Sequence, residues 1–322
     1  MHAEVMNNDT NNTKKALNKK KIRNKQPRNK QAKKGRWVPY IFILPSFLII
    51  VSFLFYPIGT VFYYSFQHYD ISAPFYNSFA GLDNFIKIFT EDELFLPSLW
   101  TSLKWVVSQV GLQLVLGLIL ALLLNQTFKF RGVVRAVAFV PWAISGVLAS
   151  VMWSLLYNEH MGVFNDLLMK MGFIDEPQAF LASTTSAFVS VVIAELWRGI
   201  PFFAITLLAS LQSIPEELYE AVRVDGAGRW KTFTAITLPH LKNTIVLTTL
   251  LRTVWEFNNV DLIFNLTGGG PAHSTTTLTM YIADLAVNGS NFGYGSALTV
   301  VSFGILFIFA VLYLRITRYE RE

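Results

Sequence analysis

The chain has 322 residues, of which 52% are hydrophobic and 15% are charged, and it contains no cysteine. Soluble domains carry about 25% charged residues, so this deficit indicates a protein whose surface is largely in contact with lipid. The absence of cysteine excludes disulfide frameworks, cysteine-based zinc sites and thiol chemistry.

The net charge of +6 comes from one end of the chain. Residues 1–36 hold twelve Lys or Arg and two acids, a net of +10, whereas the other 286 residues hold fifteen Lys or Arg and nineteen acids, a net of −4. The basic segment is rich in Asn, Gln and Lys and nearly free of aromatic residues, which is typical of disorder. We expect a disordered cytoplasmic tail over 1–36 that contacts anionic lipid rather than nucleic acid, followed by a transmembrane domain over 37–322.

Six apolar stretches follow, each about as long as the roughly 20 residues that a helix needs to cross a bilayer core. They are 38–66, 98–125, 131–157, 184–211, 243–266 and 294–316. The first is too long for the apolar part of a secretory signal peptide. The fifth fits least well because it carries Arg252, Glu256 and Asp261. The pattern predicts an all-α polytopic membrane protein with six transmembrane helices.

The charges of the loops indicate the orientation, because Lys and Arg are enriched in cytoplasmic loops. With the N-terminus inside, the cytoplasmic segments hold ten Lys or Arg besides the tail. The external segments hold only Lys87 and Lys170, with Lys104 just inside the second stretch. We therefore expect a cell-membrane protein with both termini in the cytoplasm and an even number of spans.

The predicted cytoplasmic loop 212–242 is unusually long and has its own apolar face. Ser213 begins a capping-box pattern, which predicts a short helix. Gly226 predicts a turn after that helix, because glycine tolerates positive φ. A second amphipathic segment is expected over 229–238, ended by Pro239. An ordinary connecting loop needs no apolar face, so this pattern favours a docking element for a cytoplasmic partner.

The same loop resembles the EAA loop of ATP-binding-cassette importer permeases. That motif reads EAA, three residues, Gly, nine residues and I-x-L-P, and this chain matches it from Glu220 to Pro239. It departs from the motif at Val222, where the family prefers Ala. The residues that the resemblance assigns to coupling with an ATPase subunit are Glu220, Ala221, Val222, Asp225, Gly226, Ala227, Ile236, Leu238 and Pro239.

Two further stretches resemble the carbohydrate-uptake branch of these permeases, in particular the maltose permease F type. Residues 195–203 read ELWRGIPFF, and residues 257–277 contain FNN, TGGGP and a Thr triplet. The resemblance covers residues 38–318 and implies a type I importer permease fold. It also implies that this chain is one subunit of a binding-protein-dependent importer for a sugar or oligosaccharide.

The resemblance implies several partners and no enzymatic activity in this chain. The implied partners are a second permease subunit, two ATPase subunits that bind ATP and Mg²⁺, and an extracytoplasmic solute-binding protein. The chain lacks a G-x-x-x-x-G-K-[ST] phosphate-binding loop, so ATP hydrolysis is expected on another polypeptide and no cofactor is expected here.

Charged side chains inside expected spans are costly and suggest function. Glu195 and Arg198 are three residues apart, and Arg252 and Glu256 are four residues apart. Each pair could simply neutralise itself along one helix, or could also face a shared cavity. By motif, the resemblance places substrate contacts on Trp142, Gly146, Glu195, Trp197, Arg198, Gly199, Arg252, Trp255, Glu256 and Asn259. Both a charged and a highly hydroxylated saccharide remain open.

Two other classes of function compete with a sugar permease. One is an ATP-binding-cassette permease for a non-sugar solute, such as glycerol phosphate or an amino acid. The other is a membrane-embedded enzyme or channel, for which the sequence offers little support. The five His residues have no metal-ligand spacing, and no G-x-S-x-G nucleophile turn occurs.

Overall fold

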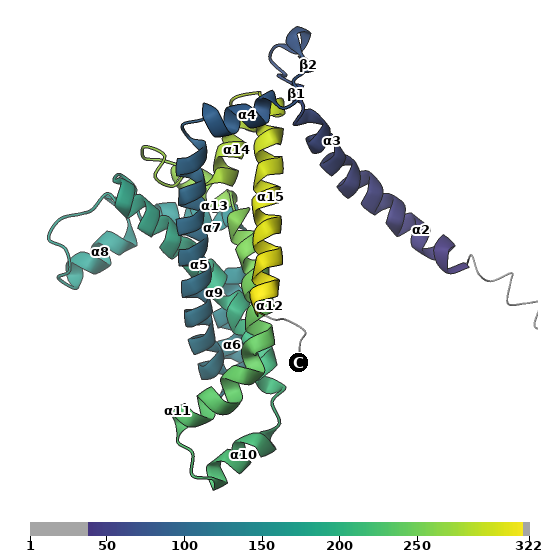
Figure 1. Cartoon of the computed structure of the whole chain (residues 1–322). Coiled ribbons are helices and arrows are strands. Elements are labelled where there is room, and N and C mark those ends of the chain that lie inside the picture. The colour runs from purple at the N-terminus through teal and green to yellow at the C-terminus, as the bar shows by residue number, and fades with distance from the viewer. Residues whose placement is uncertain (1–37, 318–322) are drawn as a thin grey trace, which may run out of the picture. The chain divides into compact units, whose positions relative to one another are not determined.

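The structure is a computed structural model that describes residues 38–317 (Figure 1). The basic tail expected over 1–36 lies outside the described residues, as do residues 318–322. The chain forms two compact units that meet between Thr60 and Val61.

The described part of the first unit, residues 38–60, consists of helix with a very apolar composition. α2 (Val38–Ile50) leads through the π-helical segment η2 (Val51–Phe55) into α3 (Tyr56–Tyr64), which crosses the boundary between the units. Pro57 has no amide hydrogen for the helix ladder, and the wider π turn lies directly before it. The helix Pro39–Tyr64 is long and apolar enough to span a membrane.

The second unit is built around long helices that pack side by side (Figure 1). Its helices of more than ten residues are α5 (Phe95–Leu124), α6 (Arg131–Ala143), α7 (Gly146–Leu156), α9 (Thr184–Gln212), α12 (Leu238–Phe257) and α15 (Phe292–Thr317). α5 and α9 form its most extensive helix pair, and Gly117 lets them approach closely. A Cβ added to Gly117 would lie 2.5 Å from the Cβ of Phe203.

Short elements connect these helices. They are β1 (Gln67–His68), η3 (Pro74–Tyr76), β2 (Ser78–Phe79), α4 (Asp83–Thr90), α8 (Val163–Lys170), α10 (Glu216–Val224), α11 (Arg229–Thr232), the π-helical segment η4 (Phe233–Thr237), α13 (Asp261–Thr267) and α14 (Leu278–Val287). β1 pairs antiparallel with β2. α10 and α11 lie at the opposite end of this unit from α4 and α14 (Figure 1).

The stretch expected to form one span over 131–157 consists of two helices. α6 and α7 are bent by 97° relative to each other at Ile144 and Ser145. Ile144 has extended backbone, and the Ser145 hydroxyl accepts a hydrogen bond from the Leu148 amide at 3.4 Å. The serine thus caps a new helix, which explains the sharp bend.

The stretch expected to form the fifth span is also interrupted. α12 ends at Phe257, and α13 begins at Asp261. Four helices of the described residues are long and apolar enough to cross a membrane, or five if the bent pair counts as one span. α12 is not among them, since its polar and charged side chains lower its hydropathy. The count of six spans stays a prediction.

The loop 212–242 contains the two predicted helical segments but differs in detail. Gly226 has φ +74° and follows α10, as expected. Ser213 does not cap α10: it ends α9 and donates a hydrogen bond to the Ser210 carbonyl. Pro239 does not end the second segment either, because α12 continues through it. As before Pro57, a π turn (η4) directly precedes the proline.

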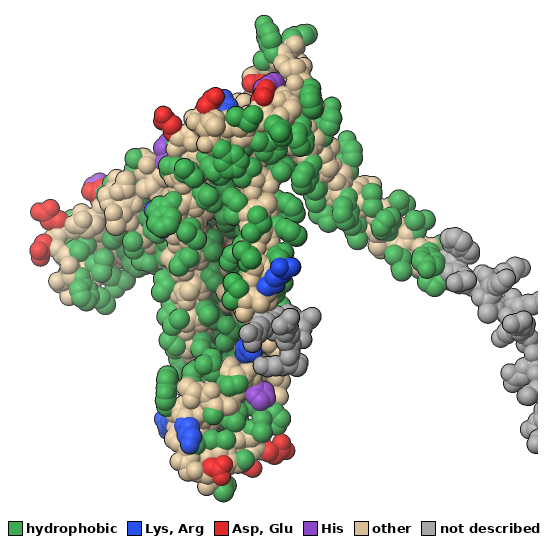
Figure 2. Space-filling view, viewed as in Figure 1, with side chains coloured by type: hydrophobic (Ala, Val, Ile, Leu, Met, Phe, Trp, Pro, Cys, Tyr) green, Lys and Arg blue, Asp and Glu red, His purple; other side chains and the backbone are tan. Residues whose placement is uncertain are grey.

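The second unit has large apolar side chains on its surface as well as in its core, and several polar side chains are buried among the apolar ones. Large apolar side chains such as Leu103, Val107 and Phe307 are exposed, and they cover much of the helical surface (Figure 2). Gln113 and Glu195, in contrast, are completely buried. Such a surface fits a protein whose helices are solvated by lipid.

Candidate functional site

Four charged side chains of α9 and α12 form one network, here called the charged cluster: Glu195, Arg198, Arg252 and Glu256. Oε1 of Glu195 accepts hydrogen bonds from Nη2 of Arg198 and Nη2 of Arg252, both at 2.9 Å. Nη2 of Arg252 also lies 2.6 Å from Oε1 of Glu256. Both intrahelical pairs therefore exist, and Arg252 joins them across the two helices.

Two glutamines of α5 complete this network and were not singled out from the sequence. Oε1 of Gln113 accepts from Nε of Arg252 at 2.7 Å, and its Nε2 donates to Glu256 at 3.0 Å and to Gln109 at 2.9 Å. Gln109 in turn donates to the carbonyl of Val192 at 3.1 Å. The signal that could have revealed them is a pair of glutamines four residues apart in an apolar stretch.

The charged cluster is deeply buried, and its polar atoms are extensively hydrogen-bonded. Glu195 is 0% exposed, Glu256 1% and Arg252 5%, whereas Arg198 is partly exposed. Buried charges are tolerated when they are paired and hydrogen-bonded. The partners supplied by α5 therefore explain how four charges persist between apolar helices.

Gly199 lies directly against this network. A Cβ added there would lie 2.3 Å from Nε2 of Gln113 and 2.5 Å from Nη2 of Arg252. Any larger residue would collide with groups that have little freedom to move. Gly199 therefore provides the space in which the three helices bring their polar groups together.

A pocket of about 310 Å³ opens beside the charged cluster. The residues that line it are Trp142, Arg198, Arg252, Trp255, Glu256 and Asn259. This volume is at the small end of the roughly 300–1,000 Å³ of typical ligand sites. Six of the ten residues that the motifs suggested as substrate contacts thus share one pocket, although they come from α6, α9, α12 and the segment after α12.

Aromatic side chains flank this pocket. The ring of Phe202 lies 6.4 Å from that of Trp142 and 5.2 Å from that of Trp255, measured between centroids. The Arg252 guanidinium lies 5.8 Å from the centroid of the same Phe202 ring. The pocket therefore combines exposed indole faces with guanidinium, carboxylate and amide groups, which suits a hydroxylated ligand better than an apolar one.

The other four suggested contacts do not line the pocket. Glu195 and Gly199 belong to the polar network behind it. Gly146 is buried against Asp261, since an added Cβ would lie 2.9 Å from the Cβ of that residue. Trp197 packs on Trp153, with ring centroids 6.0 Å apart. Its surroundings are those of a packing residue.

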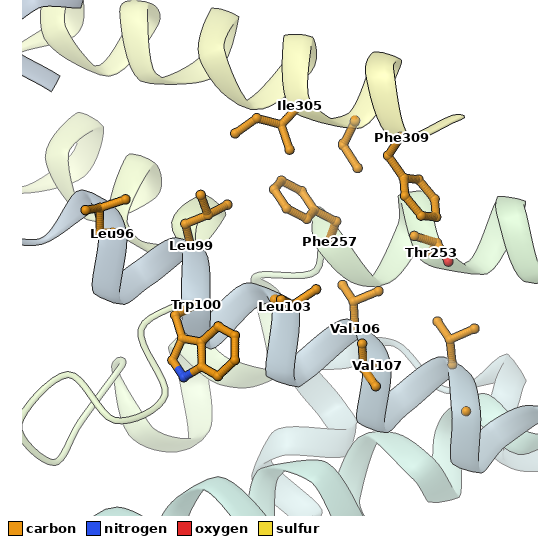
Figure 3. A pocket seen from close by; sticks show the side chains of 13 residues that line it. Leu96, Leu99, Trp100, Leu103, Val106, Val107, Thr253, Phe257, Ile305 and Phe309 are labelled. Atoms are coloured by element: carbon orange, nitrogen blue, oxygen red, sulfur yellow. The ribbon is translucent and has the colours of Figure 1, made fainter. Parts of the chain in front are cut away.

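A larger cavity of about 670 Å³ has a different chemical character (Figure 3). It lies between α5, α12 and α15, and only Thr253 and the indole N–H of Trp100 supply polar side-chain groups among its lining residues. Side chains such as Leu99, Phe257 and Ile305 point into it (Figure 3). A hydroxylated ligand would lose its hydrogen bonds to water there without replacement, so this cavity is unsuited to it.

In the loop 212–242, the residues expected to couple with a partner are mostly accessible. Glu220, Ala221, Asp225, Gly226, Leu238 and Pro239 are exposed, and Val222, Ala227 and Ile236 are partly buried. The Tyr219 hydroxyl lies 3.2 Å from the Thr237 hydroxyl, which links α10 to η4. Within residues 38–317, the acids of α10 have no ion-pair partner, so they are free to contact another protein.

Neither region contains a metal site. Among residues 38–317 there is no group of three or more His, Asp or Glu side chains that could hold a metal ion. What the two regions offer is a polar pocket between helices and an exposed helical loop.

Comparisons with known proteins agree with this arrangement. Residues 113–319 match the family described as the inner membrane component of binding-protein-dependent transport systems. The trehalose/maltose transport system permease protein of Thermococcus litoralis is 36% identical over 283 residues, which are 88% of this chain and 94% of that protein. The sulfoquinovosyl glycerol transport system permease protein of Agrobacterium fabrum is 35% identical over 283 residues, 88% of this chain and 91% of the relative.

A solved structure has the same fold. It is a bacterial ABC transporter involved in the import of the acidic polysaccharide alginate, and one of its chains aligns with a TM-score of 0.78 at 23% identity. The alignment covers 91% of this chain and 99% of the other. From the family match, the relatives and the fold, this multi-pass membrane protein belongs to the family of inner-membrane components of binding-protein-dependent transport systems, the permease subunits of ATP-binding-cassette importers.

Proposed function

We propose that this chain is a permease subunit that moves a sugar or oligosaccharide across the cytoplasmic membrane into the cell. The observation that carries the proposal is the polar pocket flanked by Trp142 and Trp255. Sugar sites combine aromatic faces with convergent hydrogen-bonding groups, and this pocket has both. The relatives named for trehalose/maltose and for sulfoquinovosyl glycerol support a sugar rather than glycerol phosphate or an amino acid.

The proposal divides the ten residues suggested by the motifs into three roles. Trp142, Arg198, Arg252, Trp255, Glu256 and Asn259 contact the sugar, because they line the pocket. Glu195 and Gly199 position the guanidinium groups from behind. Gly146 and Trp197 shape the surrounding helices.

The proposed topology has six spans, with both termini in the cytoplasm. α6 and α7 together form one broken span, and α12 crosses the bilayer with its charged side chains directed toward the pocket rather than lipid. Charged residues within a membrane are tolerated when they face an interior cavity and pair with one another. The pairs of the charged cluster support this assignment.

The proposed partners are a second permease subunit, two ATPase subunits and an extracytoplasmic solute-binding protein. ATP and Mg²⁺ bind to the ATPase subunits. When the ATPase subunits bind ATP and close against each other, they displace α10, which they contact through Glu220, Ala221 and Val222. The membrane helices then reorient and expose the pocket to the outside, so nucleotide binding shifts the population between two states.

Transport by reconstituted vesicles tests this function. The permease is co-expressed with the second permease and ATPase subunits with which it co-purifies, and the assembly is placed in liposomes with its binding protein and a panel of radiolabelled saccharides. We expect accumulation of at least one saccharide that requires both ATP and the binding protein. Transport without a nucleotide-hydrolysing partner, or accumulation only of amino acids or glycerol phosphate, would contradict the proposal.

A further inference from the structure

Three charged side chains line the pocket and the carboxylate of Glu195 lies behind it, yet proteins similar to this chain handle solutes of different charge. The solved transporter with the same fold is involved in the import of an acidic polysaccharide, whereas the permease from Thermococcus litoralis is named for trehalose and maltose. We propose that the pocket of this chain selects an uncharged saccharide, and that Glu195 and Glu256 determine this selectivity. The inference rests on the proposed sugar import and concerns the chemical class of the sugar.

The first argument is charge balance. The charged cluster contains two guanidinium groups and two carboxylates, and each guanidinium lies within 2.9 Å of a carboxylate oxygen. Arg252, which could otherwise attract an anion, contacts both Glu195 and Glu256. The positive charges are therefore neutralised by the protein before any ligand arrives.

The second argument is that the carboxylates are held firmly. Glu195 is 0% exposed, and both of its oxygens accept from Arg198 while one also accepts from Arg252. Glu256 accepts from Gln113 at 3.0 Å and from Asn259 at 3.4 Å. An anionic ligand would have to displace these buried carboxylates or lie beside them, and like charges in a poorly solvated site repel strongly.

A further carboxylate adds to this effect. Asp261 begins α13, lies against Gly146 and is close enough to Arg198 to interact with its charge, although neither Asp261 nor Gly146 lines the pocket. No cation of the described residues forms an ion pair with Asp261. The electrostatic surroundings of the pocket are therefore neutral to negative, which disfavours uronates and sulfonates.

The hydrogen-bond donors that the charged cluster leaves unused are suited to bind the hydroxyl groups of a ligand. Within residues 38–317, Nη1 of Arg198 and Nη1 of Arg252 donate no hydrogen bond to a protein acceptor. Trp142 and Trp255 are 47% and 43% exposed as whole residues. Guanidinium donors and indole faces that line one pocket can bind a neutral sugar ring through its hydroxyl oxygens and its apolar face.

Direct binding to the permease tests this selectivity. The binding protein is left out, because its own preference would filter the panel. The assembled importer in lipid nanodiscs is examined by saturation-transfer NMR against neutral oligosaccharides, including maltose and trehalose, and against uronate oligosaccharides of matched length. We expect neutral sugars to bind and uronates to bind at least about tenfold more weakly, the effect of one like-charge contact.

Two variants shift the charge of the pocket in opposite directions. Glu195→Gln leaves one guanidinium unbalanced, and we expect uronates to gain affinity relative to neutral sugars. Arg198→Gln leaves one carboxylate unbalanced, and we expect a glucosamine disaccharide, which is cationic, to gain instead. Glu159→Gln, which changes an exposed carboxylate outside the pocket, serves as the control and should keep the wild-type preference. A misfolded variant loses all ligands and cannot imitate a reversed preference.

The outcomes separate this inference from the proposed function. If uronates bind the wild-type importer as well as neutral sugars do, the inference is wrong while sugar import stands. If no saccharide of either panel binds, the proposed function fails and the inference fails with it. If one variant does not fold, the comparison of neutral and uronate ligands on the wild-type importer and on the remaining variant still tests the selectivity.

Discussion

Glutamates of α9 and α12 are buried between helices, whereas those of α10 are exposed at one end of the molecule. Glu195 and Glu256 each contact a guanidinium within 3 Å. Glu216, Glu217 and Glu220 are exposed and have no ion pair within the described residues. The same side chain therefore has a fixed set of partners in one region and none in the other.

This difference predicts how strongly a substitution in each region changes the stability of the fold. Removing one member of a buried ion pair leaves the other charge uncompensated and is strongly destabilising. Changing an exposed charge has little effect on the fold. The charged cluster should therefore govern both stability and ligand binding, while α10 should govern contact with a partner and leave stability unchanged. Variants that alter one region test this separation.

The largest expected effect follows from removing Arg252. Arg252→Leu leaves Glu195 and Glu256 buried with fewer partners, and we expect a loss of about 3–5 kcal/mol of stability. The temperature at which the detergent-solubilised assembly loses its monodisperse chromatographic peak measures this loss. Arg131→Leu, at the exposed start of α6, is the control and should change little. Equal melting of both variants would contradict the structural role of the cluster.

A smaller but sharp effect is expected at Gly199. In Gly199→Ala the new methyl would collide with Gln113 and Arg252, which typically costs about 1–3 kcal/mol for an overpacked core. Gly304→Ala is the matched control, because a Cβ at that position in α15 meets no atom within 4 Å. We expect lower melting temperature and weaker sugar binding only for Gly199→Ala. Normal binding by that variant would show that the network tolerates displacement.

A substitution in the turn after α10 should act through backbone strain rather than through a steric clash. Gly226 has φ +74°, and a Cβ there meets no atom within 4 Å. Gly226→Ala therefore costs only the strain of the left-handed conformation, about 1–2 kcal/mol. Gly228→Ala, at φ −72°, provides the control. We expect slower ATP-driven uptake for Gly226→Ala, with sugar binding in nanodiscs retained; loss of binding would contradict the separation of the two regions.

The smallest effect on stability and the clearest effect on coupling are expected on the exposed face of α10. The double change Glu220→Arg with Ala221→Asp alters two exposed residues and should change stability by less than about 0.5 kcal/mol. We expect the ATPase subunits to be lost during affinity purification while membrane insertion is unaffected. Retention of the ATPase subunits together with normal uptake would exclude the coupling role of these residues.

The sequence predicts the loop 212–242 more completely than it predicts the pocket. Motif spacing located Gly226 and both helical segments, because short helices and a glycine turn depend on local sequence. It gave the wrong ends for those segments: Ser213 and Pro239 have the composition of a helix start and a helix stop. A π turn before Pro239 lets the helix continue, and periodicity does not reveal such a turn.

For the pocket, the sequence showed the charged residues but not the ion pairs and hydrogen bonds that connect them across helices. The spacing of Glu195 from Arg198 and of Arg252 from Glu256 determined the two intrahelical pairs. The bond between Arg252 and Glu195, and the contacts of Gln113, depend on how three helices rotate and pack against one another. No single helix contains that information, because it arises from the side chains at each crossing.

Length, hydropathy and short-range spacing are local properties, so the apolar segments, the loop typical of the family and the charges within the helices could be read from the sequence. Tertiary structure alone decided that α6 and α7 meet at 97°, that Gly199 makes room for Gln113, and that four charges balance beside one pocket. Those features require residues from separate helices to meet within a few ångströms. Packing between helices, rather than any pattern along one of them, sets these distances.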